Sequence, residues 1–303
     1  ETMSRGLRLM LRSFMAEVAH PSKKRGEDAS FMLRDRVRAL SAIGVADGVG
    51  GWASEGVDAG EYSRRLMALT RENLVASKDP CPLKALERAR EYTQLLGSST
   101  ACVAVLYQGV LKTLNVGDSG FMVVKPRSKQ AHTYDMVYRT KEQQHRFNMP
   151  FQLSFGPYSD KPSSGDAWEY KANPGDVVLM ATDGVWDNLF DEEVMQALCS
   201  AKGDLKVAAH LIANLSIKKG LATSVRTPFN ERHNQLFSDE KRTAGKLDDV
   251  TCVVSEVVEE EVASQDGPRE GVNKEKEAAT NNKMSGDDVN DMELIDSLRS
   301  AIM

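Results

Sequence analysis

The sequence predicts an α+β fold, and three observations support this prediction. Between residues 98 and 183, short apolar and β-branched runs alternate with turn residues, as they do in antiparallel sheets. Two of these runs, Thr100–Tyr107 and Val110–Val116, are joined by Gln108-Gly109, which is the length of a two-residue hairpin. Helical apolar spacing marks one pair of segments before this region and another pair after it.

In the first third of the chain, apolar spacing predicts strands followed by two helices. We expect one or two strands over Leu7–Val18 and a buried strand in the apolar run that leads to Ala46. Asp58–Ser77 and Pro82–Leu96 have roughly helical apolar spacing. Pro82 suits a first helical turn and Gly97 suits a helix end, so the second helix is expected to fill the whole interval.

In the remainder of the chain, further strands are expected at Phe121–Lys125, His132–Arg139, Trp168–Lys171, Val177–Thr182 and Val250–Val257. Two helices are expected, over Glu192–Cys199 and Leu205–Lys218. The segment Leu221–Lys246 is polar and is predicted to be irregular. It is too long for a neutral connection, so we expect it to shape the rim of a site.

Composition divides the 303 residues into a folded domain and a tail. Residues 1–258 have the apolar content of a globular domain, whereas residues 259–303 are rich in charge and poor in apolar side chains, which predicts disorder. Apolar spacing over Asp288–Ile302 is compatible with a terminal amphipathic helix.

Charge and hydropathy exclude several classes of function. From Glu256 onward there are 13 acidic and 5 basic residues against a net charge of −5, so the body is only mildly basic and no nucleic-acid interface is expected. No apolar run approaches the ~18 residues of a membrane span. Four scattered cysteines without metal-type spacing predict reduced thiols and an intracellular location, either the cytoplasm or an organelle such as the mitochondrion.

Aspartates stand at the ends of several apolar runs. Asp47, Asp118 and Asp183 follow such runs, and Asp248 precedes the last one. Any one of them alone is more often a turn former or a helix cap. Together they suggest a common cause, because carboxylates about 5 Å apart repel by roughly 3 kcal/mol per pair at an effective dielectric constant near 20. Divalent cations remove this repulsion, and a ligand set made only of oxygen selects Mg²⁺ or Mn²⁺ over Zn²⁺.

A basic cluster, Lys23-Lys24-Arg25, stands directly before the acidic pair Glu27-Asp28. Composition alone is equally compatible with a solvated turn in which neighbouring charges compensate. The alternative is a phosphate-binding cluster beside a metal ligand.

With these residues in view, the chain resembles the metal-dependent type-2C Ser/Thr protein phosphatases, and especially a subgroup that includes mitochondrial and plastid members. Each motif is weak alone, but the set follows the family's order over residues 7 to about 258. The motifs are Gly26-Glu27-Asp28-Ala29, Val45-Ala46-Asp47-Gly48-Val49-Gly50-Gly51-Trp52, Gly97-Ser98-Ser99-Thr100-Ala101, Asn115-Val116-Gly117-Asp118-Ser119, Ala181-Thr182-Asp183-Gly184-Val185-Trp186-Asp187 and Leu247-Asp248-Asp249-Val250-Thr251. Met149–Ser154 and Thr227–Phe229 carry the resemblance to the subgroup.

The resemblance implies an α-β-β-α sandwich, in which two stacked antiparallel sheets are flanked by helices. It also implies hydrolysis of phosphoserine and phosphothreonine in a protein substrate by a water that bridges two Mg²⁺ or Mn²⁺ ions. The expected enzyme is a monomer that binds neither nucleic acid nor membrane.

The resemblance also assigns roles to individual residues. Asp47 would bridge the two ions, the Gly48 carbonyl, Asp183 and Asp248 would complete their ligands, and Glu27 would hold a metal-bound water. Asp118 and Asp187 correspond to ligands of a third, weaker ion. Lys23, Lys24 and Arg25 would bind the substrate phosphate.

Three positions depart from the family pattern. Val49 replaces a histidine that has been assigned as the acid for the leaving oxygen, so another group must supply that proton. Lys23 replaces an arginine and cannot form the bidentate pair with phosphate that a guanidinium forms. Asp249 replaces an asparagine and adds negative charge.

Two other functions remain open from the sequence. A pseudophosphatase would use the sandwich as a binding module, and loss of the metal aspartates would indicate it; none is lost. A phosphatase of a small phosphorylated metabolite would share the aspartates and differ in the flap over Ser154–Trp168.

Overall fold

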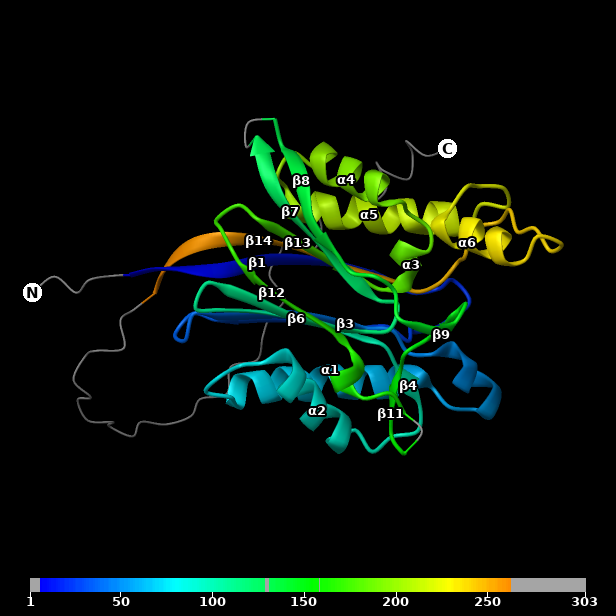
Figure 1. The fold of residues 1–303 in the computed structure, drawn as a ribbon, viewed down its shortest axis with the longest axis horizontal. Helices are drawn as coiled ribbons and strands as arrows, with labels where there is room; N and C mark the ends of the chain where they lie inside the picture. Colours follow the sequence, from blue (N-terminus) through cyan, green and yellow to red (C-terminus); the bar gives the residue numbers. More distant parts are fainter. Residues whose placement is uncertain (1–5, 129–130, 158, 263–303) are drawn as a thin grey trace, which may run out of the picture. The chain divides into compact units, whose positions relative to one another are not determined.

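The computed structural model describes residues 6–128, 131–157 and 159–262. Within them, two five-stranded antiparallel sheets lie face to face, and helices cover the outer face of each sheet (Figure 1). This arrangement confirms the predicted α+β class and the α-β-β-α sandwich. The predicted tail lies largely outside the described residues, as does the terminal helix expected over 288–302.

The first sheet joins the two ends of the described chain. Its strand order is β1 (Gly6–Val18), β14 (Val250–Val262), β13 (Val177–Ala181), β7 (Gly120–Ser128) and β8 (Thr133–Arg139). β1 is one continuous strand, and it pairs with β14 from Gly6↔Val262 to Val18↔Val250. β14 therefore continues beyond Val257, where the sequence predicted its end, because β1 supplies backbone partners for the extra residues.

All strands of the second sheet lie within residues 29–171, an interval that also contains β7 and β8 of the first sheet. Its strand order is β12 (Asp166–Lys171), β6 (Val110–Val116), β5 (Ala101–Tyr107), β3 (Leu40–Ala46) and β2 (Ala29–Asp35). The predicted hairpin between β5 and β6 is confirmed. Gln108 and Gly109 have φ of 52° and 77°, the left-handed conformations that a tight two-residue hairpin requires.

Four longer helices cover the two sheets (Figure 1). α1 (Ala59–Ala76) and α2 (Pro82–Tyr92) pack on the second sheet, and α4 (Asp191–Ser200) and α5 (Leu205–Gly220) pack on the first. α2 ends at Tyr92 rather than at the predicted Leu96. Thr93 terminates it, since its hydroxyl donates to the Ala89 carbonyl at 2.7 Å and its ψ of 80° leaves the helix. None of the described helices is long and apolar enough to cross a bilayer.

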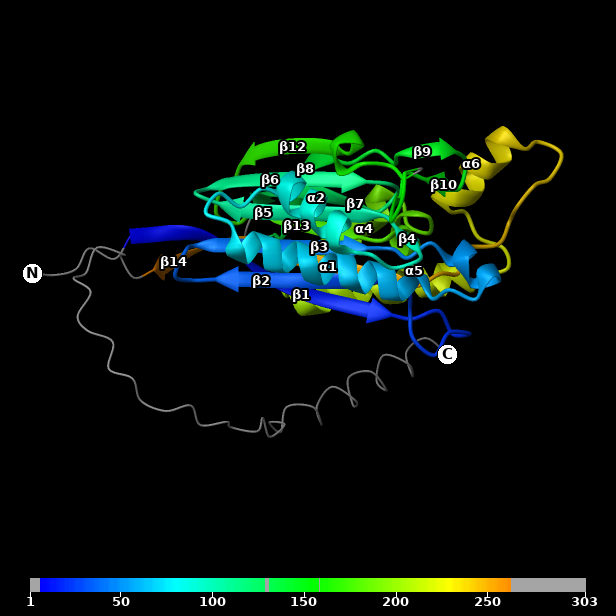
Figure 2. The ribbon, with the colours of Figure 1, turned by 90° about the horizontal axis from the view of Figure 1, so that it is seen from below.

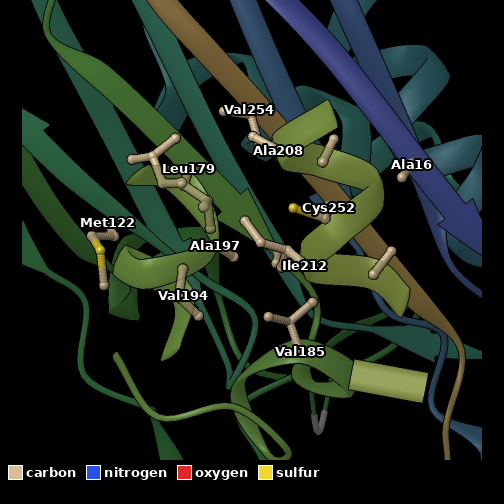
Figure 3. Close-up of a cluster of buried hydrophobic side chains, with 14 of the residues drawn as sticks. Ala16, Met122, Leu179, Val185, Val194, Ala197, Ala208, Ile212, Cys252 and Val254 are labelled. Atoms are coloured by element: carbon tan, nitrogen blue, oxygen red, sulfur yellow. The ribbon is translucent and has the colours of Figure 1, made fainter. Parts of the chain in front are cut away.

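Three apolar layers hold the sandwich together. One lies between the sheets, one lies under α1 and α2, and the third lies under α4 and α5. Figure 3 shows the third layer, where Val194 of α4 and Ile212 of α5 meet Leu179 and Cys252 of the sheet. All four cysteines are free, and Cys102 and Cys252 are buried.

The remaining elements are short. They are the 3₁₀-helices η1 (Gly50–Glu55) and η2 (Pro162–Ser164), the one-turn helix α3 (Asp183–Trp186), helix α6 (Pro228–Leu236) and the short strands β4 (Ser98–Ser99), β9 (Gln144–Arg146), β10 (Met149–Pro150) and β11 (Leu153–Ser154).

Helix α6 corrects the prediction that Leu221–Lys246 is irregular. Thr227 caps the helix, accepting a hydrogen bond from Asn230 N while the Asn230 side chain accepts one from Thr227 N. Pro228 occupies the first helical position, where its missing N–H costs nothing. The helix was overlooked because only Phe229 and Asn230 are buried, which gives it almost no apolar periodicity.

Candidate active site

Three of the strand-end aspartates meet in space. Asp47 follows β3, Asp118 lies in the turn between β6 and β7, and Asp183 follows β13. One carboxylate oxygen from each lies within 4.8 Å of the others. Asp183 and Asp118 are buried, and Asp47 is half-buried. The clustering predicted from the sequence is therefore present for these three residues.

Backbone contacts fix the loop that carries Asp47. The Thr100 hydroxyl accepts from Asp47 N at 3.0 Å, and Thr100 N donates to Asp47 O at 2.9 Å. Gly48 N donates to the Glu27 carbonyl at 3.2 Å, which brings the two predicted ligand segments together. A side chain at position 48 would place its Cβ 2.8 Å from the Glu27 carbonyl oxygen, so only glycine fits this approach.

The Asp183 segment turns at once into α3, whereas the sequence predicted only a strand end. Thr182 joins this turn to its neighbours, since its hydroxyl donates to Asp28 Oδ2 at 2.8 Å and accepts from Thr251 N at 3.0 Å. A Cβ at Gly184 would lie 2.0 Å from the Asp249 carbonyl oxygen. Asp183 is thus held against the segment that carries Asp248.

Burial, followed by repulsion between neighbouring carboxylates, raises the pKa of several carboxyl groups in the cluster. Burial raises the pKa of Asp47, and the neighbouring Asp183 and Asp28 raise it further. Burial likewise raises the pKa of Asp118 and Asp28, each of which has one buried carboxylate oxygen without a hydrogen-bond partner. Burial also raises the pKa of Asp248 to about 6. These groups would gain from a bound cation, and their hard oxygen atoms fit Mg²⁺ or Mn²⁺.

Two cations that the sequence analysis did not identify enter the cluster. Lys246 Nζ lies 2.5 Å from Asp183 Oδ2, 2.6 Å from Asp187 Oδ2 and 3.6 Å from Asp248 Oδ2. Arg232 Nη2 lies 2.6 Å from Asp187 Oδ1. Burial opposes the charge of Asp183, but attraction and hydrogen bonding from Lys246 leave its pKa lowered. Both cations come from the segment that was predicted to be irregular.

The basic cluster separates into one anchored and two exposed side chains. Lys23 Nζ donates to Glu27 and, at 2.8 Å, to Asp249 Oδ2. Lys24 and Arg25 are exposed beside it. Both remain accessible to an anion at the edge of the cluster.

Asp249 organises this loop instead of adding an unpaired charge. Its carboxylate accepts from His20 N at 2.6 Å, from Glu27 N at 2.8 Å and from Lys23. Burial disfavours its ionisation, but these hydrogen bonds leave its pKa lowered. Lys23 therefore compensates the negative charge that Asp249 adds where the family has an asparagine.

A rim of aromatic and polar contacts borders the cluster. Phe147, in the turn between β9 and β10, packs against Phe229, His233 and Phe237 with ring-centroid distances of 5.0, 5.8 and 5.8 Å. The β9–β10 hairpin thereby lies beside α6 (Figure 2). Val49 directly precedes η1, and its side chain carries no proton donor.

The chain is similar to curated protein phosphatases. It is 40% identical over 258 residues to the "Probable protein phosphatase 2C 55" of Arabidopsis thaliana, a match that covers 82% of this chain and 52% of that protein. It is 36% identical over 256 residues to the "Protein phosphatase PTC7 homolog" of Homo sapiens, covering 77% of this chain and 80% of that protein. The chain thus spans about half the length of the plant relative.

Solved structures share the fold. The photosystem II phosphatase PBCP superposes with a TM-score of 0.72 at 29% identity, covering 81% of this chain and 98% of that one. The catalytic domain of the phosphatase PstP, which was solved with 2 manganese ions, has a TM-score of 0.56 at 18% identity over 82% of this chain and 99% of that one. No profile of a known protein family matches the sequence.

Proposed function

Because this chain belongs to the metal-dependent type-2C protein phosphatases, we propose that it hydrolyses phosphoserine and phosphothreonine in protein substrates. The observation that carries the proposal is the meeting of Asp47, Asp118 and Asp183 within 4.8 Å at the ends of separate strands. A purely structural sandwich gains nothing from placing these carboxylates together, since their mutual repulsion costs stability.

The donor set fits two divalent ions. Asp47, the Gly48 carbonyl, Asp183 and Asp248 are the proposed ligands, with Glu27 acting through a water. Divalent ions bound there would lower the pKa of a coordinated water and offset the charge that develops on the phosphoryl group. The unpartnered buried oxygens of Asp28 and Asp118 support a cation at this place. Mg²⁺ or Mn²⁺ is the proposed cofactor.

Other residues of the chain are proposed to bind the substrate phosphate and to position the metal ligands. Lys23, Lys24 and Arg25 are proposed to bind the substrate phosphate, with Lys23 held by Asp249 and the other two exposed. Thr100 holds the Asp47 backbone and Thr182 holds the Asp28 carboxylate, so both segments are positioned before a substrate binds. No phosphoenzyme is required by this arrangement, which is consistent with burial raising the pKa of Cys102 and Cys252 and leaving these thiols unreactive.

The experiment measures phosphate release from a phosphothreonine peptide during titration with Mg²⁺ and with Mn²⁺, and repeats it with chelator. A phosphorylated sugar of similar concentration serves as the parallel substrate. We expect metal-dependent release from the peptide and little from the sugar. Activity that survives the chelator would contradict the metal mechanism, preference for the sugar would favour a metabolite phosphatase, and metal binding without any turnover would favour a pseudophosphatase.

The proposed setting is a monomeric enzyme inside the cell, in the cytoplasm or an organelle such as the mitochondrion. Free cysteines support a reducing compartment, and the partner is a phosphoprotein rather than a nucleic acid or a membrane.

A further inference from the structure

A lysine ammonium group stands inside the carboxylate cluster itself. Lys246 Nζ is within 2.6 Å of oxygens from both Asp183 and Asp187 and 3.6 Å from Asp248 Oδ2. Its side chain is only 17% exposed. A cation with three carboxylate neighbours occupies the kind of position in which a divalent ion would otherwise bind.

Hydrogen bonds fix the backbone of Lys246, so its side chain enters the cluster from a defined position. Asn188 holds the residue on both sides: its amide group donates to Lys246 O at 2.7 Å and accepts from Lys246 N at 3.1 Å. Asn188 is itself buried and also donates to Gly184 O at 3.0 Å in the α3 turn. The Phe229 ring of α6 lies 5.2 Å from Nζ. Lys246 is thus anchored to the same turn that carries Asp183.

A second cation completes the neutralisation of Asp187. Arg232 Nη2 binds Asp187 Oδ1 at 2.6 Å while Lys246 binds Oδ2, so each oxygen of this carboxylate is paired with a side-chain cation. Arg232 is also paired with Glu142, which fixes the guanidinium from its other side. A divalent ion at Asp187 would have to displace one of the two side chains and face the charge of the other.

The surroundings of Asp118 and Asp47 differ from those of Asp187. Asp118 Oδ1 is buried without a hydrogen-bond partner. Asp118 and Asp47 lie with Asp183 in the group whose oxygens come within 4.8 Å. Lys246 also pairs with Asp183, but among the described ion pairs it does so through Oδ2 alone, whereas both oxygens of Asp187 are paired with side-chain cations.

We propose that Lys246, assisted by Arg232, is a built-in cation that closes Asp187 to metal, so that the protein binds two divalent ions and holds lysine where a third would lie. The inference rests on the proposed metal site, and it replaces the third ion that the family resemblance suggested for Asp118 and Asp187. A lysine in this role fixes one positive charge at the site independently of the metal concentration.

The test counts metal ions without using activity. Purified protein is equilibrated with Mn²⁺, and bound metal is measured by native mass spectrometry and by equilibrium dialysis. We expect two ions in the wild type and three in Lys246→Met, which keeps an unbranched side chain, one atom shorter, and removes its charge. Lys219→Met is the matched control, because Lys219 is similarly covered, with 14% exposure, but pairs with Glu193 away from the cluster; it should bind two ions.

A second variant keeps the inference testable if Lys246→Met does not fold. Asp187→Asn should leave both the ion count and the Mn²⁺ affinity within about twofold of the wild type, because Asp187 is not a ligand. A tenfold or greater loss of affinity in Asp187→Asn, a wild-type count other than two, or an unchanged count in folded Lys246→Met would overturn the inference. A protein that binds two ions but hydrolyses no phosphoester would refute the proposed function and leave this inference standing.

Discussion

At the scale of single residues, the strand-end aspartates were predictable and their counter-charges were not. Each aspartate adjoins an apolar run, and this placement can be recognised from local sequence. Lys246 and Arg232 reach the cluster from a polar segment without periodicity, so their partners are set only by tertiary folding. Asp249 could be recognised as a departure from the family, but its three hydrogen-bond donors could not.

Asp47→Asn is expected to lower kcat by at least about 100-fold, equivalent to roughly 2.7 kcal/mol, because it keeps the shape of the side chain and removes the charge that assembles both ions. Phosphate release from a phosphothreonine peptide measures the effect. Asp176→Asn is the control, since Asp176 is a buried carboxylate at the other end of β13 from Asp183, where it accepts a hydrogen bond from Asn173 N. An Asp47→Asn enzyme as fast as the wild type would rule out Asp47 as a ligand of the catalytic metal ions.

Replacing Lys23, Lys24 and Arg25 together with Ala is expected to raise KM for phosphopeptide by about tenfold, since charge-assisted hydrogen bonds to phosphate are lost. A variant that keeps Lys23 and replaces only Lys24 and Arg25 should retain the pairing of Lys23 with Glu27. Comparing the two variants separates anchoring of the loop from binding of the phosphate. Mn²⁺ affinity is measured in parallel. Unchanged kinetics in the triple variant would reduce the cluster to a solvated turn.

At the scale of elements, the strands and the longer helices followed the sequence, whereas the short elements at the site did not. The hairpin at Gln108-Gly109 was specified by its turn length. α6 escaped detection, although Thr227 and Pro228 are a recognisable helix start, because the helix is only nine residues long and only two of them are buried. Its importance is positional, since Phe229 N donates to Asp187 O at 3.0 Å and Arg232 lies one turn further along.

Thr227→Ala is expected to destabilise α6 by about 1 kcal/mol through loss of its N-cap, and to loosen Arg232. Asp204→Ala removes the corresponding cap of α5, where the side chain accepts from Val207 N at 3.0 Å. Both variants should lose roughly 2–4 °C in Tm. Only Thr227→Ala should change the kinetics, and equal kinetics in the two variants would show that α6 does not position the site.

At the scale of the whole molecule, two sheets packed between helices could be predicted, but the strand order within each sheet could not. Strand order depends on which edges meet across long loops, and β1 pairs with β14 from the far end of the described chain. The boundary predicted after residue 258 did not anticipate this pairing, because the acidic residues 259–261 resemble the tail in composition.

Truncation should therefore depend on where the chain is cut. A cut after Val262 keeps β14 complete and should change Tm by less than about 2 °C, because the removed residues have little apolar surface to bury. A cut after Val258 removes the partners of Gly6–Leu9 and the ion pair between Arg34 and Glu260, and should lower Tm by more than the first cut. Equal melting temperatures would mean that the end of β14 contributes nothing to stability.

Without metal, the protein should lose stability as pH rises from about 4 to 7. Burial raises the pKa of Asp248 from 3.8 to about 6 and that of Asp47 well above 3.8, so the folded state holds protons that the unfolded state has released. The lowered pKa values of Asp183 and Asp249 act below this window. Tm measured with chelator at pH 5 and pH 7.5 tests the sign, and saturating Mn²⁺ should abolish the decline. A Tm that rises over this range would contradict it.

The pairing of β1 with β14 has a consequence for biosynthesis. The second sheet uses only residues 29–171, so it can assemble with α1 and α2 while the ribosome is still extending the chain. β1 emerges first but must wait for β14, which is a delay of roughly 10–50 s at ~5–20 residues per second. During that interval, nascent β1 lacks the partner that covers it in the finished protein. Chaperone capture of ribosome-bound chains should therefore persist until the final strand leaves the exit tunnel.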